Sequence, residues 1–421
     1  MPRTRLRPDS TRRPEESSAE CNTSSNLSLN APVFLMDLWC FIPYYMARLC
    51  KSLRDECIDV RLGSVRYHLD RKYFANQRLE TDPWLLDFGG GITNSFFRRI
   101  VKSFEYFINL LVLSVRFAIA NPGVLHVQFL PFLERGWAIE VWFLQWIKRL
   151  GIPIVYTAHN TTPQDNPGQY LLLYKKVYAI ADALICHGEE ARAEIVENFG
   201  VPREKTRVIS HGPLFDEKPL LSPEEAKANL GLPPEMPVVL SLGVISEYKG
   251  IPFLLDAWKA AVDAGMNGRL IVAGNGDAEL LSRIRAKVSR ERLEGSVELM
   301  LQFIRVELLP VLYQAADVLV YPYKAGTTSG ALLTGMNYSK AMVTTTLPFF
   351  CELLTHDRDA LLIGYGDVEG WAQALRTLAE DSGRRTRLAH NVKQSKALVS
   401  SWAGIARATG ECYLSVMAKK G

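Results

Sequence analysis

Cysteine is scarce in this sequence, and positive charge is only slightly in excess of negative charge. The seven cysteines among 421 residues include no C-x-x-C pair, which argues against a zinc knuckle. The formal net charge is only +4, so the basic footprint of a nucleic-acid-binding protein is not expected. No apolar run reaches the ~18 residues of a membrane span, because Arg116 interrupts the nearest one, 106–120. These exclusions leave a globular protein, and its length is sufficient for two domains.

Residues 1–30 contain almost no apolar side chains, and we expect them to be disordered. No apolar stretch follows their arginines, so we expect no secretory signal. The predicted location is the cytoplasm, with peripheral contact at the inner face of the cell membrane as an option.

Short apolar runs alternate with amphipathic segments from residue 31 onward, which predicts parallel α/β sheets. Helical patterns cover 43–56, 96–120, 134–150 and 188–199. The predicted strands are 33–38, 59–64, 124–130, 153–158, 183–186 and 206–210, followed by 238–243, 269–274, 296–300, 317–322, 341–346 and 360–365. Six prolines in 212–237 mark a connection. We therefore predict doubly wound domains at 31–215 and 238–400, a linker at 216–237 and a terminal helix at 401–421.

Two turns between strand and helix in the second half suit a bound anion. One leaves a strand at Gly243 and reaches a helix near Gly250, with Lys249 just before it. A helix N-terminus and a flexible cation can together bind a diphosphate. The next turn contains Gly274 and Asn275, where a tight turn without any ligand is the simpler interpretation.

A third turn, "TTSG" at 327–330, opens a helix that carries no charged residue up to Lys340. Thr327, Thr328 or Ser329 can cap this helix, and Gly330 allows a ligand to approach the backbone closely. The helix dipole and free N–H groups would then bind phosphate without a charged side chain. An ordinary capped helix is the alternative.

Two histidines in the first half follow predicted strands. His159 comes directly after the strand at 153–158 and precedes Asn160 and a polar loop, and His211 closes the first half. A histidine at a strand end can contact a ligand or transfer a proton. Either residue can instead be structural, and His211 can simply fix the hinge.

Five segments, read in order, resemble one known family. They are "VYTAHN", "ICHGEEARAEIVENFGVPREKTRVISHG", "LSLGVISEYKGIPFLLDAW", "LIVAGNGD" and "TTSGALLTGMNYSKAMVTT". Together they resemble the GT-B glycosyltransferases of the family-4 type, from residue 31 to the end. The resemblance implies two Rossmann-like domains facing a cleft, with a C-terminal helix that crosses back. It also implies transfer of a sugar from a nucleotide-diphosphate donor, with retention and without a metal or other cofactor.

The resemblance assigns roles to matching residues. Lys249 would neutralise the diphosphate, His159 would lie near the reacting sugar as the catalytic candidate, and the amides of Ser329 and Gly330 would meet the donor. The expected donor site comprises Gly243, Lys249, Gly274, Asn275, Thr327, Thr328, Ser329, Gly330 and Thr334, with Asn160 and His211 as further candidates.

Two departures from the family pattern leave alternatives open. Val244 stands where many members have arginine, and the usual pair of glutamates would align with Gly326 and Thr334. An active variant is favoured, but a non-catalytic sugar-nucleotide-binding partner of a glycan assembly complex remains an alternative. An inverting transferase is another, for which Glu134 or Asp165 would be the general base by position only.

The segment 96–120 is the strongest feature for the acceptor side. Basic residues Arg98, Arg99 and Lys102 precede a strongly apolar helix, and 136–151 adds three tryptophans. Such a face can lie on an anionic membrane, which would suit a lipid-linked acceptor in polysaccharide or envelope glycan synthesis. Packing on the first sheet is the alternative.

Overall fold

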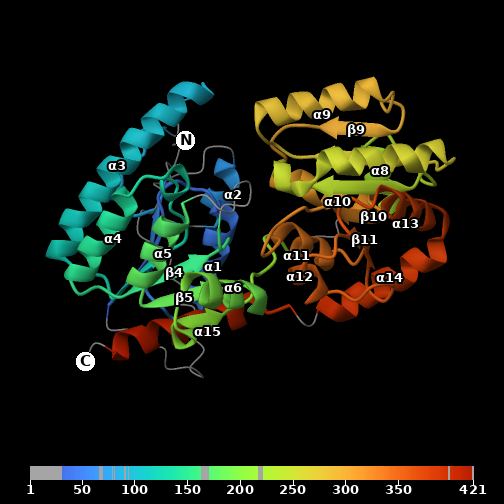
Figure 1. The fold of residues 1–421 in the computed structure, drawn as a ribbon. Coiled ribbons are helices and arrows are strands. Elements are labelled where there is room, and N and C mark those ends of the chain that lie inside the picture. The colour runs from blue at the N-terminus through green and yellow to red at the C-terminus, as the bar shows by residue number, and fades with distance from the viewer. Residues whose placement is uncertain are drawn as a thin grey trace, which may run out of the picture.

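The computed structural model describes residues 31–65, 70–77, 79, 81–89, 92, 94–162, 170–216, 221–396 and 399–419. The predicted tail 1–30 and the candidate base Asp165 lie outside these residues. Figure 1 shows two α/β units beside each other, the first in blue and green and the second in yellow and orange.

The first domain is built on a six-stranded parallel sheet with the order β2-β1-β3-β4-β5-β6. Its strands are β1 (Val33–Asp37), β2 (Val60–Ser64), β3 (Val124–Val127), β4 (Ile154–Ala158), β5 (Ala183–Cys186) and β6 (Thr206–Val208). Its helical elements are α1 (Pro43–Asp55), α2 (Arg71–Asn76), α3 (Ser95–Ile119), η2 (Leu133–Arg135), α4 (Ile139–Arg149), α5 (Leu171–Ile180), α6 (Glu189–Phe199) and η3 (Arg203–Lys205).

Side-chain alternation along β1 shows how this sheet is covered. Phe34 and Met36 face the core formed with α3, α4, α5 and α6, whereas Val33 and Leu35 face the core formed with α1. Successive residues of a strand point to opposite faces, so covering both faces requires a continuous apolar run. This explains why the sequence reads as uninterrupted apolar strands.

The second domain repeats the plan, with the strand order β12-β11-β10-β7-β8-β9. Its strands are β7 (Val238–Leu242), β8 (Arg269–Ala273), β9 (Val297–Met300), β10 (Val318–Tyr321), β11 (Ala341–Thr344) and β12 (Leu361–Leu362). Its helical elements are η4 (Glu247–Lys249), α8 (Ile251–Asp263), α9 (Ala278–Arg290), η5 (Val306–Leu308), α10 (Leu309–Ala315), α11 (Gly330–Asn337), α12 (Pro348–Cys351), α13 (Val368–Glu380) and α14 (Ser382–Ser395). Every predicted strand is confirmed, and α7 (Pro223–Asn229) lies in the proline-rich connection.

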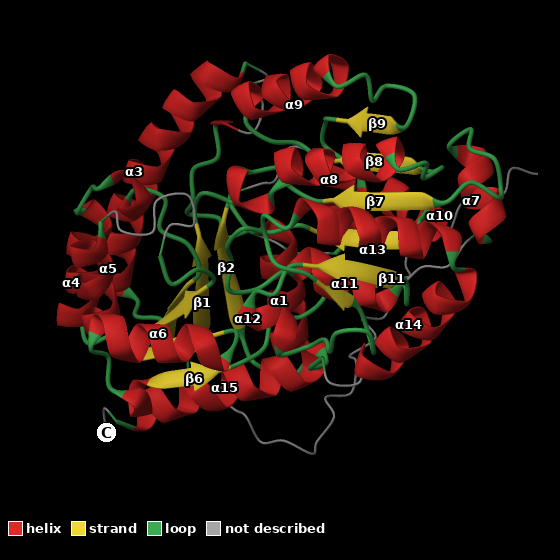
Figure 2. Cartoon of the chain, turned by 45° about the vertical axis from the view of Figure 1, so that its right-hand side comes forward, coloured by secondary structure: helices red, strands yellow, loops and turns green. Residues whose placement is uncertain are grey.

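The last helix, α15 (Trp402–Ala418), returns to the first domain, as predicted. Figure 1 shows it in red beneath the first sheet, and Figure 2 places it beside β6. Ile405 and Ala406 pack with Val33 and Leu35, and the indole Nε1 of Trp402 donates to the carbonyl of Pro213 at 2.8 Å. The chain therefore closes the uncovered face of its first sheet with its final segment.

Candidate functional site

The carboxyl ends of β4 and β10 meet where the two domains touch. The hydroxyl of Thr327, in the turn after β10, donates to the carbonyl of His159, in the turn after β4, at 2.9 Å. A second contact runs from the backbone N–H of Leu214 to the hydroxyl of Thr334 at 3.0 Å. In parallel α/β sheets, ligands bind outside these strand ends. The structure thus brings His159 and the "TTSG" turn together at the junction of the two domains.

Lys249 ends η4 and points toward the start of α11. Its Nζ donates to the hydroxyl of Tyr323 at 2.9 Å and lies 4.5 Å from the centre of that ring. It also lies 3.5 Å from the position that a Cβ on Gly243 would occupy. Burial alone would lower the pKa of this ammonium group, but the phenol groups of Tyr323 and Tyr248 beside it raise the pKa on balance. Lys249 is therefore a charged group with no carboxylate recorded beside it in the described structure.

The N-terminus of α11 lies at the other end of this hydrogen-bonded chain. The hydroxyl of Tyr323 lies 3.2 Å from that of Ser329, and the Ser329 hydroxyl caps the helix by accepting from Leu332 N–H at 3.1 Å. The N–H groups of Gly330 and Ala331 have no acceptor within the described part of the chain. Such N–H groups at a helix N-terminus attract anions.

Two glycine turns pack tightly next to Lys249. A Cβ on Gly274 would lie 1.8 Å from the carbonyl oxygen of Gly243, and Ile245 N–H donates to Asn275 carbonyl at 2.8 Å. Gly274 therefore serves close packing against the backbone of Gly243, in keeping with the simpler interpretation given above for the turn of Gly274. The side chain of Asn275 is exposed, and its contact with a donor stays a prediction.

His159 is part of a chain of buried polar side chains. Its Nδ1 lies 3.1 Å from Nε2 of His187, and its Nε2 lies 2.8 Å from the side-chain amide of Gln128. The Nδ1 of His187 donates to the carbonyl of Ile209 at 2.9 Å. Both ring nitrogens of His159 are thus occupied within the first domain, and its backbone carbonyl is the group directed toward the second domain.

Burial holds these histidines neutral. It lowers the pKa of His126 to about 3, that of His187 to about 4 and that of His159 well below its usual value. His126 joins the chain through Gln128 at 2.8 Å and through the hydroxyl of Tyr413 in α15 at 2.7 Å. Helix α15 therefore contributes a hydroxyl group to the chain of polar side chains behind His159.

His211 lies at the junction of the two domains. Its Nδ1 donates to the carbonyl of Gly212 at 2.6 Å, and its ring packs on Tyr45 with centroids 4.7 Å apart. A Cβ on Gly330 would come within 3.0 Å of its Cε1. His211 and Leu214 therefore pack against the N-terminus of α11, where a side chain larger than that of glycine would force its neighbours to shift.

The remaining candidates have less direct positions. The hydroxyl of Thr334 is buried and donates to the carbonyl of Gly330 at 2.7 Å, so it already has structural partners. Thr328 and Asn160 are half-buried, and Glu134 forms a side-chain hydrogen bond with Tyr174. Their contacts with donor or acceptor stay predictions. Across the described residues, no cluster of side chains suited to hold a metal ion occurs.

The sequence interpretation missed three groups of this site, namely Tyr323, Gln128 and His187. His187 had a readable signal, because it follows β5 in the same way that His159 follows β4. Adjacent parallel strands end at the same edge of a sheet, so the two rings had to be neighbours.

Models of two known families match most of the chain. Residues 236–381 match "Glycosyl transferases group 1", and residues 42–212 match "Glycosyltransferase Family 4". Among curated relatives, a D-inositol 3-phosphate glycosyltransferase of Saccharomonospora viridis is 25% identical over 325 residues, covering 72% of each chain. An uncharacterised glycosyltransferase of Methanocaldococcus jannaschii is 22% identical over 284 residues, covering 64% of this chain and 71% of the relative.

Solved structures share the fold over nearly the whole length. HepE of Anabaena in complex with UDP and glucose superposes with a TM-score of 0.72 at 16% identity, covering 91% of this chain and 100% of that one. Sucrose-phosphate synthase from Thermosynechococcus elongatus gives a TM-score of 0.69 at 18% identity, covering 92% and 100%.

Proposed function

We infer the reaction from family membership, because this chain belongs to the group 1 glycosyl transferases of family 4 and is a glycosyltransferase of the GT-B fold. We propose that it transfers a hexose from a nucleoside-diphosphate sugar to a glycan or lipid-linked acceptor. UDP is the favoured nucleotide, since HepE of Anabaena, which shares the fold, has been solved with UDP-glucose.

The observation that carries this proposal is the line from Lys249 through Tyr323 to Ser329. The ammonium group and the first turn of α11 both lie beside Gly243, since a Cβ there would be 3.5 Å from Lys249 Nζ and 3.8 Å from Ala331 Cβ. A departing diphosphate gains negative charge as the glycosidic bond breaks, and preorganised donors aimed at that charge stabilise the transition state. This arrangement needs no metal, and it explains why α11 begins with a neutral turn.

His159 would act through its carbonyl group in this proposal. That oxygen faces the second domain and accepts from Thr327, while the ring is held from behind by His187 and Gln128. A fixed carbonyl dipole favours the positive charge that develops on the sugar ring. We propose transfer with retention on this basis, in keeping with the resemblance to retaining family-4 enzymes.

Isothermal titration calorimetry with EDTA present tests the donor site. UDP, GDP, ADP and dTDP are titrated into the wild type, Lys249→Ala and a control, Lys259→Ala. Lys259 lies on the surface of α8 and pairs with Asp263 at 2.6 Å. We expect one nucleotide to bind selectively, and Lys249→Ala to weaken it by roughly 10- to 100-fold, as for loss of a charged hydrogen bond.

Two results would count against the proposal. Binding of no nucleotide at millimolar concentration would overturn the donor site. Equal weakening in Lys249→Ala and Lys259→Ala would show that the overall positive charge of the domain, rather than the ammonium group of Lys249, attracts the diphosphate.

A further inference from the structure

Helix α3 presents an apolar stripe to the outside of the first domain. Its exposed members, spaced three or four residues apart, are Phe97, Ile100, Phe104, Ile108, Leu111, Val115 and Ile119. Each exposes between 40% and 81% of its surface, and together they extend along about 33 Å of helix at 1.5 Å per residue. Helices of monomeric proteins rarely leave such a continuous stripe uncovered.

Helix α4 widens this stripe. Trp142 and Trp146 are exposed one turn apart, and the indole Nε1 of Trp146 donates to the carbonyl of Ser114 in α3 at 3.1 Å. We call these two tryptophans and the seven residues of the stripe the outer face. Tryptophan favours the boundary between water and hydrocarbon, because its ring is apolar and its N–H is polar.

The carboxylates of α3 and α4 all lie on the inside. The only carboxylates of these helices, Glu105 and Glu140, are buried. Glu105 accepts from the N–H groups of Phe88 and Gly89 at 2.8 Å each, and Glu140 accepts from Tyr106 at 2.5 Å. The two helices contribute the cations Arg98, Arg99, Lys102, Arg116, Lys148 and Arg149. They therefore bring no acidic side chain to the outer face.

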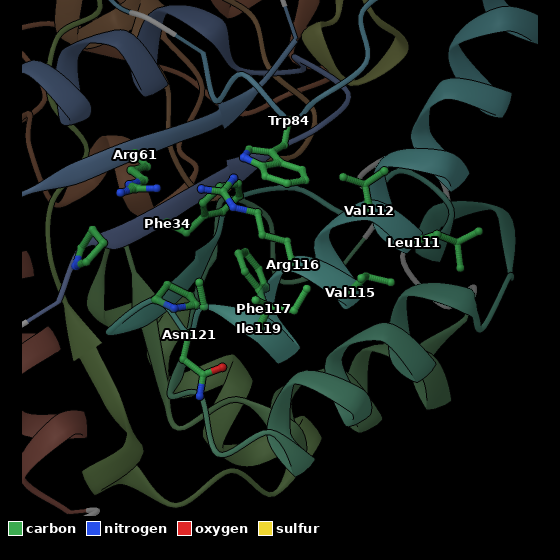
Figure 3. Close-up of a pocket in the computed structure, with 13 residues that line it drawn as sticks. Phe34, Arg61, Trp84, Leu111, Val112, Val115, Arg116, Phe117, Ile119 and Asn121 are labelled. Carbon is green, nitrogen blue, oxygen red and sulfur yellow. The ribbon is translucent and has the colours of Figure 1, made fainter.

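A cavity of about 690 Å³ opens where the outer face reaches the sheet edge. Leu111, Val115 and Ile119 of the outer face line one side of it, and Phe34 of β1 and Arg61 of the edge strand β2 belong to its wall. Figure 3 shows Trp84 and Arg116 beside it. Arg116 is neutralised by an ion pair with Asp82, whereas Arg61 is exposed with no acidic partner recorded within the described residues. An apolar cavity with one cation at its wall suits a hydrocarbon chain attached to an anionic headgroup.

We propose that the outer face lies on an anionic lipid bilayer and that this cavity takes one acyl chain of a bilayer lipid. Among the described residues, no helix is both long and apolar enough to span a membrane, so the contact is peripheral. A second copy of this chain would fit less well, because its own outer face would bring no carboxylate to meet these cations.

The placement of α3 also links the bilayer to the cleft. Figures 1 and 2 both show its first turns extending beyond the first sheet toward α9 of the second domain. A helix lying in the membrane surface would hold the space between the domains near that surface. This would bring a lipid-linked acceptor within reach, so the inference deepens the proposed function on its acceptor side.

Vesicle sedimentation tests the proposal without donor or acceptor. Full-length protein is mixed with vesicles of phosphatidylcholine alone or with phosphatidylglycerol added. Val115→Glu places a charge on the outer face, and Val244→Glu is a matched control because its valine is 69% exposed, against 63% for Val115, and lies in the second domain. Val112→Trp fills the cavity from a wall residue that is not part of the outer face.

We expect binding to the mixed vesicles only, a loss of at least tenfold in Val115→Glu, none in Val244→Glu, and a severalfold loss in Val112→Trp. Nucleotide binding by Val115→Glu, measured by calorimetry, shows whether the variant is folded and whether its donor site is intact, independently of vesicle binding. Undiminished vesicle binding by folded Val115→Glu would overturn the proposal. Unchanged binding by Val112→Trp would overturn the acyl-chain site. A change of oligomeric state in Val115→Glu, seen by size exclusion, would identify the outer face as a protein interface instead.

Discussion

His211 gives the sharpest stability prediction, because its buried ring must stay neutral. Burial lowers its pKa from the ordinary 6.5 to about 3. His211→Asn keeps a side-chain N–H that can reach the carbonyl of Gly212, but it has no group that titrates between pH 3 and 7. The substitution therefore separates the cost of protonation from the loss of the hydrogen bond.

The sign and size of the effect follow from the two pKa values. Below pH 6.5 the unfolded chain gains a proton at His211, whereas the folded protein does not until about pH 3. Stability from this group is thus complete above pH 6.5 and is lost as the pH falls. Between pH 7.5 and 5.5 the loss is about 1.4 kcal/mol. His126 and His187 act in the same direction, with pKa values lowered to about 3 and about 4.

Two buried carboxylates oppose the histidines. Burial raises the pKa of Asp37 to about 6 and that of Glu140 to about 7, so their protonation stabilises the folded protein as the pH falls. These groups are present in both proteins and cancel in a difference between wild type and His211→Asn. Urea unfolding at pH 7.5 and 5.5, followed by fluorescence, should show a smaller fall in unfolding free energy for the variant, by about 1.4 kcal/mol. Equal falls in the two proteins would refute the assigned pKa shift.

Three further predictions concern the site. Tyr323→Phe removes the hydroxyl that holds the Lys249 ammonium, and nucleotide affinity measured by calorimetry should fall about fivefold, corresponding to about 1 kcal/mol; unchanged affinity would remove this residue from the donor site. Gly274→Ala should lower the free energy of unfolding, measured by urea denaturation, by about 2–4 kcal/mol, because its Cβ would lie too close to the carbonyl oxygen of Gly243. Gly295→Ala, where a Cβ meets nothing within 4 Å, is the control, and equal effects would contradict the close packing. Thr334→Val leaves the N–H of Leu214 without its acceptor and should lower the free energy of unfolding by about 1–3 kcal/mol. Thr334→Ser, which keeps the hydroxyl group, is the control and should lose less stability in the same assay.

The fold could be predicted because both sheets are covered on both faces. A run such as 33–38 is buried throughout, so the ends of the apolar run mark the ends of the strand. Glycine and proline residues then mark the turns between the elements. The same logic located Lys249 and Ser329, since each lies next to a strand-to-helix turn whose backbone geometry favours particular residue types.

Tyr323 could not be found in this way. It follows a buried strand and is itself buried, so from the sequence it resembles any core aromatic residue. Its hydroxyl acquires a role only because Lys249, 74 residues earlier, lies against it. Gln128 is similar, because it follows β3 whereas its partner His159 follows β4. Contacts of this kind depend on which strands are neighbours, and local patterns carry no record of that order.

The return of α15 to the first sheet also has a consequence for synthesis of the chain. β1 and α1 are made before the second domain, yet α15, which covers part of their surface, is made after it, and the hydroxyl of Tyr413 in α15 is a partner of His126. While the ribosome is still translating the second domain, the first domain has an exposed apolar flank and a buried histidine without one of its partners. The first domain therefore begins to fold before the second domain is made and is completed only after it, and removal of α15 should damage the first domain rather than the neighbouring second one.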